Sequence, residues 1–160
     1  MPTLPPSVLK TMAFGKVEKF VVVVHSRKQP ADNEWEDYIQ FNLRVYAPGD
    51  TLKYLVVTDG GAPTAAQRMI MNEKLSEYVR GNNQLFRSAI VTGSTFVRGV
   101  VTALSWFNSG FYAFSPQHLD DAMRYLEVPP AHHDEIRELI KKLRANLQFI
   151  GPPIKGIDGD

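Results

Sequence analysis

The loop formed by Thr58, Asp59, Gly60 and Gly61 has residue types that suit the binding of a small anion. It lies where a predicted strand is followed by a helix, which is the usual ligand position of an open α/β sheet. Helix amino termini attract anions, and Arg68 could reach the same loop. The glycines fit neither a dinucleotide-binding nor a P-loop pattern. We therefore interpret this loop as a tight turn, with ligand binding as the alternative.

The segment His132-His133-Asp134-Glu135 contains metal-ligating residue types, but their spacing is wrong for a metal site. Ligands on a helix must be three or four residues apart to share a face, and adjacent histidines point about 100° apart. We therefore expect no metal here. Asp134 and Glu135 are instead predicted to stabilise the amino end of a helix.

Serine and histidine residues are present, but no nucleophile motif joins them. The candidates are Ser94, Ser105 and Ser115, with His25 or His118 as the base, and none lies in a Gly-x-Ser-x-Gly elbow. The chain contains no cysteine, which excludes disulfides, thiol nucleophiles and cysteine-ligated metals. We expect no catalytic residue and no cofactor.

The composition of the 160-residue chain, with 44% hydrophobic and 22% charged residues, is typical of one globular domain. The 18 basic and 17 acidic residues give a net charge of +1, which disfavours a nucleic-acid binder. The sequence shows no signal-peptide pattern and no apolar window of about 20 residues. We therefore expect a cytoplasmic protein without a membrane span.

Hydrophobic periodicity and the positions of proline and glycine divide the chain into alternating strands and helices. Four consecutive valines make residues 17–25 typical of a strand buried on both faces, and the helix 94–107 is apolar over much of its circumference. That helix is expected to be the most buried one. The predicted strands are 17–25, 52–57, 88–92 and 111–114, and the predicted helices are 34–46, 64–79, 94–107, 116–126 and 131–147.

This alternation predicts an α/β fold with mostly parallel strands joined by right-handed crossovers. The last helix carries an apolar stripe, which we expect either to cover the sheet or to form a partner surface. Its members are Ile136, Leu139, Ile140 and Leu143, followed by Leu147.

Residues 86–126 contain a succession of motifs that resembles a known family. The motifs are Ala89-Ile90-Val91-Thr92, Phe96-Val97-Arg98, Ala113-Phe114-Ser115, and Leu119-Asp120-Asp121-Ala122 with Tyr125-Leu126. They are similar to the carboxy-terminal half of the SpoIIAA-like (STAS/SEC14-like) domains of bacteria, whose members show "aVVTD", a helix with an aromatic and an Arg, "vFpl" and "eLdeAraWL". The similarity extends more loosely back to Phe20.

The resemblance implies a STAS-like sandwich with a four to five-stranded mixed or mostly parallel sheet. Four helices would cover this sheet, mainly on one side, with an additional C-terminal helix, and the first strands of the family can be antiparallel. The expected division is an N-terminal extension at 1–16, the STAS-like domain at 17–128, the additional helix at 129–147 and a Pro/Gly tail at 148–160.

The resemblance also implies a function. STAS domains act by binding other proteins, and some are switched by phosphorylation at the start of the helix after the strand matching 52–57, where Thr64 and, less closely, Thr58 lie. SEC14-type relatives hold lipids. We therefore expect a non-enzymatic protein-interaction module in a bacterial signalling or regulatory assembly, which binds another protein or a second copy of itself. The alternative is a domain that binds a small anionic or lipid ligand at the loop 58–68.

Overall fold

The computed structural model describes residues 10–79, 86–105 and 110–147. Its sheet has the order β1-β2-β3-β4-β5, in which β1 is antiparallel to β2 and the other strands are parallel. The α/β fold with a mixed five-stranded sheet is thereby confirmed. The elements are β1 Met12–Val17, β2 Phe20–His25, α1 Asp32–Val45, β3 Leu52–Thr58, α2 Ala65–Val79, β4 Phe86–Thr92, α3 Thr95–Ser105, β5 Phe111–Phe114, α4 Leu119–Tyr125 and α5 His133–Ala145, with short 3-10 turns at Pro116–His118 and Pro130–His132.

The predicted single strand 17–25 is in fact the second half of a hairpin. β1 pairs with β2 from Met12 opposite His25 to Val17 opposite Phe20, and Glu18 in the turn has a φ of 52°. Two-residue hairpin loops usually contain Asn-Gly or Asp-Gly. This loop consists of Glu18 and Lys19, so the sequence did not indicate a turn here. Residues assigned to an N-terminal extension therefore form an edge strand of the sheet.

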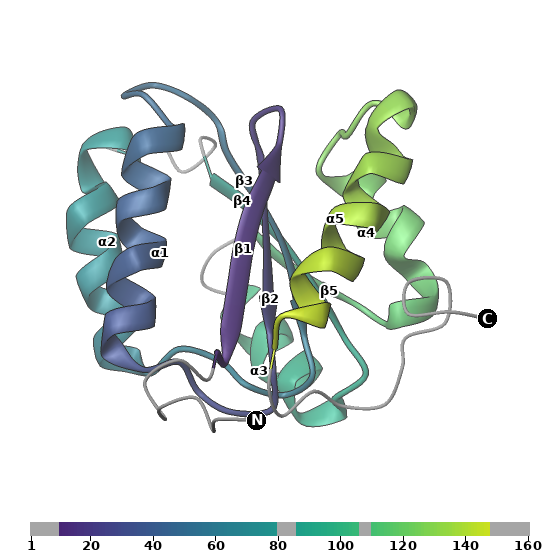
Figure 1. Cartoon of the computed structure of the whole chain (residues 1–160), viewed down its shortest axis with the longest axis horizontal. Coiled ribbons are helices and arrows are strands. Elements are labelled where there is room, and N and C mark those ends of the chain that lie inside the picture. The colour runs from purple at the N-terminus through teal and green to yellow at the C-terminus, as the bar shows by residue number, and fades with distance from the viewer. Residues whose placement is uncertain (1–9, 80–85, 106–109, 148–160) are drawn as a thin grey trace, which may run out of the picture.

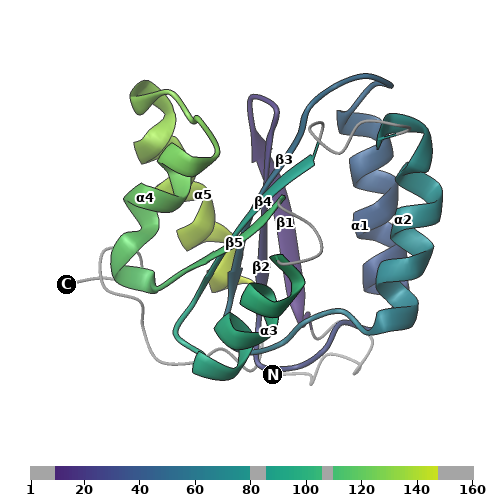
Figure 2. The same cartoon turned by 180° about the vertical axis from the view of Figure 1, so that it is seen from behind.

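Helices cover both faces of the sheet, whereas the resemblance implied that they lie mainly on one side. Figure 1 shows α1 and α2 on one side of the strands and α4 and α5 on the other. Seen from behind, α3 lies beside β4 and β5 (Figure 2). Helices α1 to α3 each connect one parallel strand to the next, while α4 and α5 follow the last strand and are free to return over the opposite face.

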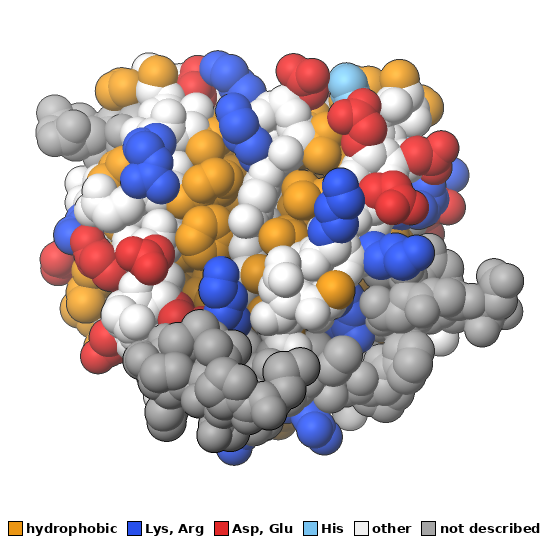
Figure 3. Space-filling model, in the orientation of Figure 1, with side chains coloured by type: hydrophobic (Ala, Val, Ile, Leu, Met, Phe, Trp, Pro, Cys, Tyr) orange, Lys and Arg blue, Asp and Glu red, His pale blue; other side chains and the backbone are white. Residues whose placement is uncertain are grey.

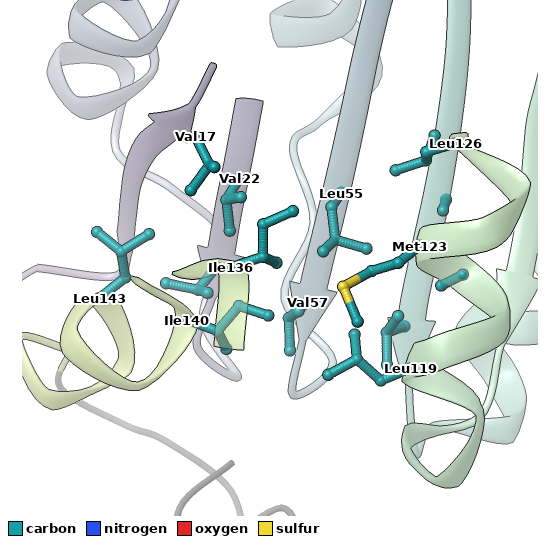
Figure 4. Packing of buried hydrophobic residues seen from close by; sticks show 14 of the residues in the cluster. Val17, Val22, Leu55, Val57, Leu119, Met123, Leu126, Ile136, Ile140 and Leu143 are labelled. Atoms are coloured by element: carbon teal, nitrogen blue, oxygen red, sulfur yellow. The ribbon is translucent and has the colours of Figure 1, made fainter. Parts of the chain in front are cut away.

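Two hydrophobic cores lie on the two faces of the sheet, and successive valines of β2 alternate between them. On the α4 and α5 face, Met123, Ile136 and Ile140 point toward strand residues such as Val22 and Val57 (Figure 4). All of these side chains are fully buried. This alternation confirms that the valine run is a strand buried on both faces.

Aromatic side chains dominate the core on the α1 face. Trp35 and Tyr38 of α1 are buried there, and the half-buried Phe14 of β1 lies 5.3 Å from the Tyr38 ring and 5.0 Å from the Phe41 ring. Figure 3 shows hydrophobic side chains along the seam between α1 and β1, with Lys and Arg side chains beside them. The edge strand β1 is thus covered by α1 on this face.

Candidate functional site

Thr58 closes the turn that follows β3. Its side chain is buried, and its hydroxyl donates a hydrogen bond to the carbonyl oxygen of Gly61 at 2.5 Å and accepts one from the N–H of Gly60 at 3.1 Å. Gly60 has a φ of 127°, which favours glycine. The Thr58 hydroxyl therefore holds a tight turn together and lies inside the folded protein.

Gly61 allows this turn to pack directly on the loop after β2. Its N–H donates to the carbonyl oxygen of Ser26 at 2.8 Å. A Cβ at this position would lie less than 3.0 Å from the carbonyl oxygens of Ser26 and Lys28. The glycine is required here by the close approach of two backbones.

Asp59 directs its carboxylate toward the last turn of α5. Its Oδ2 lies 2.9 Å from Nη1 of Arg144, and the side chains are 9% and 1% exposed. Charged groups this deeply buried are stable when they are paired. The acidic group of this loop, for which ligand binding was the alternative interpretation, therefore pairs with a helix of the same chain.

Thr64 and Gln67 form a capping box at the start of α2. The Thr64 hydroxyl accepts a hydrogen bond from the N–H of Gln67 at 3.1 Å, and Gln67 Oε1 accepts one from the N–H of Thr64 at 2.9 Å. Arg68 is exposed, and its Nη1 donates to the carbonyl oxygen of Pro63 at 2.9 Å. The structure thus brings the predicted loop residues together, and Thr58, Asp59, Thr64 and Arg68 each form a polar contact with another residue of the chain.

Gln67 was missed by the sequence interpretation, although the Thr-x-x-Gln spacing was a signal for it. Its buried amide donates to the carbonyl oxygen of Pro30 at 2.9 Å and to Oδ1 of Asp32 at 3.0 Å. The main-chain carbonyl oxygen of Gln67 accepts a hydrogen bond from Nε1 of Trp35 at 2.7 Å. The hydrogen bonds of Gln67 therefore connect the start of α2 to the start of α1.

His25 is buried at the carboxyl end of β2. Burial lowers the pKa of His25 to about 4, and the nearby carboxylate of Glu34 opposes that shift only in part. Nδ1 of His25 has no hydrogen-bond partner among the described residues. A buried, neutral imidazole in this position contributes to the core and is not presented to a substrate.

The serine candidates lie in structural positions. Ser94 Oγ accepts a hydrogen bond from the N–H of Val97 and so caps α3, while the side chain of Ser105 lies outside the described part. Ser115 Oγ is 3.2 Å from Nδ1 of His118 on an exposed turn. A catalytic pair needs a third group to orient the histidine, and in the described ranges no acidic side chain bonds to His118.

The histidines near the start of α5 bond to separate partners. His132 Nδ1 is 3.0 Å from Oε1 of Glu135, and His133 Nε2 is 3.0 Å from the carbonyl oxygen of Val128. Within the described part of the chain, no group of three or more His, Asp or Glu residues could hold a metal ion.

The apolar stripe of α5 covers the sheet, so it is not the partner surface. Ile136 and Ile140 are fully buried, and Leu143 is buried in the same core (Figure 4). Leu139 is partly buried and packs against this core. Gly15 of β1 leaves room for Leu139, because a Cβ there would lie 3.2 Å from Leu139 Cδ1. The stripe had to be buried, and the hairpin β1–β2 provides the surface that buries it.

Helix α3 instead exposes large apolar side chains, contrary to the expectation that it is the most buried helix. Phe96 is 79% exposed and Val100 is 44% exposed, whereas Val101 is buried. Phe96 and Val100 are four residues apart and form one ridge on the helix surface, which we call the α3 ridge. α3 packs beside β4 and β5 at the end of the sheet (Figure 2), and the α3 ridge lies on a side of the helix that is exposed.

A second apolar feature lies at β5. Tyr112 is 56% exposed, and its ring lies 5.0 Å from the Phe114 ring and 5.6 Å from the Tyr125 ring. A hollow beside it is lined by Val101, Thr102, Tyr112 and Ala113. The exposed apolar surface of this molecule therefore includes both α3 and the strand next to it.

None of the helices in the described ranges has the length and apolar character needed to cross a bilayer. Comparison of the chain with protein-family models, with curated proteins and with solved structures found no significant match.

Proposed function

We propose that this chain is a non-enzymatic, STAS-like protein-interaction module that works in a bacterial signalling or regulatory assembly in the cytoplasm. The resemblance of residues 86–126 to SpoIIAA-like domains supports this proposal. So does the mixed five-stranded sheet, whose first strand is antiparallel, as the first strands of that family can be. The single observation that carries the proposal is the exposure of Phe96 and Val100 on the α3 ridge.

The chemistry of α3 suits the centre of a protein interface. Burying a phenylalanine side chain stabilises a protein or a complex by about 2 kcal/mol. Because Phe96 is exposed in this chain, a partner that buries it would gain this free energy on binding. Interface centres are poor in charged residues, and Arg98 is the only charged residue of α3. We therefore propose a partner protein with an apolar patch that is bordered by carboxylates facing Arg98.

The test compares proteins captured from a lysate of the native cell by the wild-type chain, by Phe96→Ser/Val100→Ser, and by Met69→Ser/Ile70→Ser. Met69 and Ile70 of α2 are 62% and 44% exposed and form a matched control on another helix. We expect at least one protein to be captured by the wild type and the α2 variant and lost with the α3 variant. Its affinity for the purified wild-type chain should then fall at least tenfold in the α3 variant, as measured by calorimetry.

The proposal fails if every captured protein is retained by the α3 variant, or is lost equally with the α2 variant. Circular dichroism must show that both variants remain folded. Both pairs of positions are exposed, and surface substitutions usually change stability by less than about 0.5 kcal/mol.

Binding of a small anion or lipid at the loop 58–68 remains the alternative function. It is less supported, because Asp59 is paired with Arg144, the Thr58 hydroxyl is held in the turn and Thr64 caps α2. Thermal unfolding in the presence of nucleotides, phosphate or lipids tests it. A ligand that binds only the folded state would raise the melting temperature, and this rise should vanish in Arg68→Ala.

A further inference from the structure

The outer side of β5 offers main-chain hydrogen-bonding groups. In the described part of the chain, β5 is an edge strand whose only strand neighbour is β4. Ser88 of β4 pairs with Phe111, and the N–H of Ser88 donates to the carbonyl oxygen of Gly110 at 2.6 Å. In a parallel ladder the residues that bond to the neighbouring strand alternate with those that do not. The N–H and C=O groups of Phe111 and Ala113 therefore point away from β4.

Of the features that usually protect an edge strand, β5 has a short length of four residues, but its own residues include no lysine or proline and its described pairing with β4 shows no bulge. Proteins discourage pairing at edges with lysine, proline or bulges, or by covering the edge. The other edge strand, β1, has Lys16 exposed and is flanked by α1 and α5. Residues 110–115 read Gly-Phe-Tyr-Ala-Phe-Ser, without a charge or a proline. β5 is thus an uncharged edge with an exposed Tyr112 beside a hollow.

We propose that a second copy of this chain occupies this edge, with the two β5 strands paired antiparallel about a two-fold axis at Tyr112. The outward-pointing residues Phe111 and Ala113 lie symmetrically on either side of Tyr112. A two-fold axis at Tyr112 therefore pairs Phe111 of one copy with Ala113 of the other, and each such pair exchanges both of its hydrogen bonds. The two sheets become one continuous ten-stranded sheet.

The occupant is a second copy because the edge is complementary to itself. The outward-pointing N–H and C=O groups of Phe111 and Ala113 keep their spacing when the strand is rotated about the two-fold axis. Because the strand carries no charge, no like charges lie opposite each other in the dimer. The two Tyr112 residues form the central pair without hydrogen bonds, in which opposite Cα atoms are about 4.5 Å apart. Each Tyr112 ring, already packed on Phe114 and Tyr125, gains the other ring as a neighbour.

The proposed contact is small. A four-residue strand is about 13 Å long, so the interface falls at the low end of specific interfaces, below about 1,200 Å² in total. We therefore expect a reversible dimer that forms with rising concentration. This inference uses β5 and does not depend on the partner proposed for the α3 ridge.

Sedimentation velocity of the full chain, from micromolar to near-millimolar concentration, measures the association. We expect the mass to rise from 18.0 kDa toward twice that value. Ala113→Pro removes an outward-pointing N–H without removing a bond to β4, and proline is tolerated on edge strands, so this variant should stay folded and monomeric. Tyr112→Lys places like charges opposite each other and should also be monomeric. Phe96→Ser should associate as the wild type does.

Cross-linking locates the axis, because the natural chain has no cysteine. The variant Tyr112→Cys has one thiol, which the proposed axis places opposite its counterpart, within disulfide reach. Under mild oxidation we expect it to form a covalent dimer at least tenfold faster than Gln117→Cys, a control at another exposed position. A wild-type chain that stays monomeric throughout would overturn the proposal. So would a dimer that persists in Tyr112→Lys, or equal cross-linking rates for the two cysteine variants.

Discussion

Arg144 in the last turn of α5 and Asp59 after β3 form an ion pair, with Nη1 2.9 Å from Oδ2, although 85 positions separate them in the chain. This pair joins the C-terminal helix to the end of the sheet where the parallel strands finish. It also gives Asp59 a partner within the chain. The geometry therefore links the packing of α5 to the shape of the loop that the sequence analysis interpreted as a tight turn, with ligand binding as the alternative.

Removing one member of this pair should be costly. Arg144→Met leaves the carboxylate of Asp59 buried without its cation, and we expect the free energy of unfolding to fall by about 3 kcal/mol or more. Lys142→Met, at an exposed position of the same helix, is the control and should change it by less than about 0.5 kcal/mol. Urea unfolding measures both. Equal effects in the two variants would mean that the ion pair does not stabilise the fold.

Two glycine-to-alanine substitutions should have opposite effects. In Gly61→Ala the new Cβ meets the backbone of the β2–α1 loop, and we expect a loss of about 2–3 kcal/mol. In Gly99→Ala the Cβ meets nothing within 4 Å on α3, and we expect a gain of about 0.5–1 kcal/mol from helix propensity. Thermal melts followed by circular dichroism can rank the two variants and the wild type. A stable Gly61→Ala variant would contradict the close approach of the two loops.

Stability should depend on pH through His25. Its pKa is about 4 in the folded state, below the usual value of 6.5, so between these values the unfolded state binds more protons. The contribution of His25 is therefore fully present above about pH 6.5 and is lost as the pH falls toward 4. We expect about 2 kcal/mol to be lost between pH 7 and pH 5.

Denaturant unfolding of His25→Gln across the same pH range tests this expectation. The variant should be less sensitive to pH than the wild type, because its side chain does not titrate. His118→Gln removes an exposed imidazole and should retain the wild-type pH dependence. If His25→Gln and the wild type lost stability in parallel, another group would be responsible.

The capping box of α2 predicts the effect of changing Thr64. Thr64→Ala removes the acceptor for the N–H of Gln67 and should cost about 1 kcal/mol, whereas Thr64→Ser keeps the hydroxyl and should cost much less. Chemical denaturation of the three proteins measures the difference. Equal stabilities of the Ala and Ser variants would show that the hydroxyl does not cap the helix in solution.

The sequence predicted most of the elements, because apolar periodicity and the positions of proline and glycine report local structure. The four valines of β2 and the strand 111–114 are examples. The hairpin was missed, since Glu18 and Lys19 are unusual turn residues and β1 has little alternation of its own. Local patterns therefore indicate that a segment is a strand better than they indicate the position of a turn that joins two strands.

Long-range relationships were harder to predict from the sequence. The stripe of α5 indicated that Ile136 and Ile140 must be buried, but periodicity does not identify the surface that buries them. The apolar character of α3 suggested that it would be the most buried helix, while the exposure of Phe96 follows from the position of α3 beside the end of the sheet. The pairing of Asp59 with Arg144 has no local signal at all.

The order of strands in the sheet has a consequence for synthesis on the ribosome. Because the spatial order β1-β2-β3-β4-β5 follows the chain, each emerging strand can be added beside the one made before it. The last helix, however, returns to the first hairpin, where Ile136 and Ile140 meet the α5 face of β2. A nascent chain must therefore keep that first surface from aggregating until nearly the whole domain has been translated.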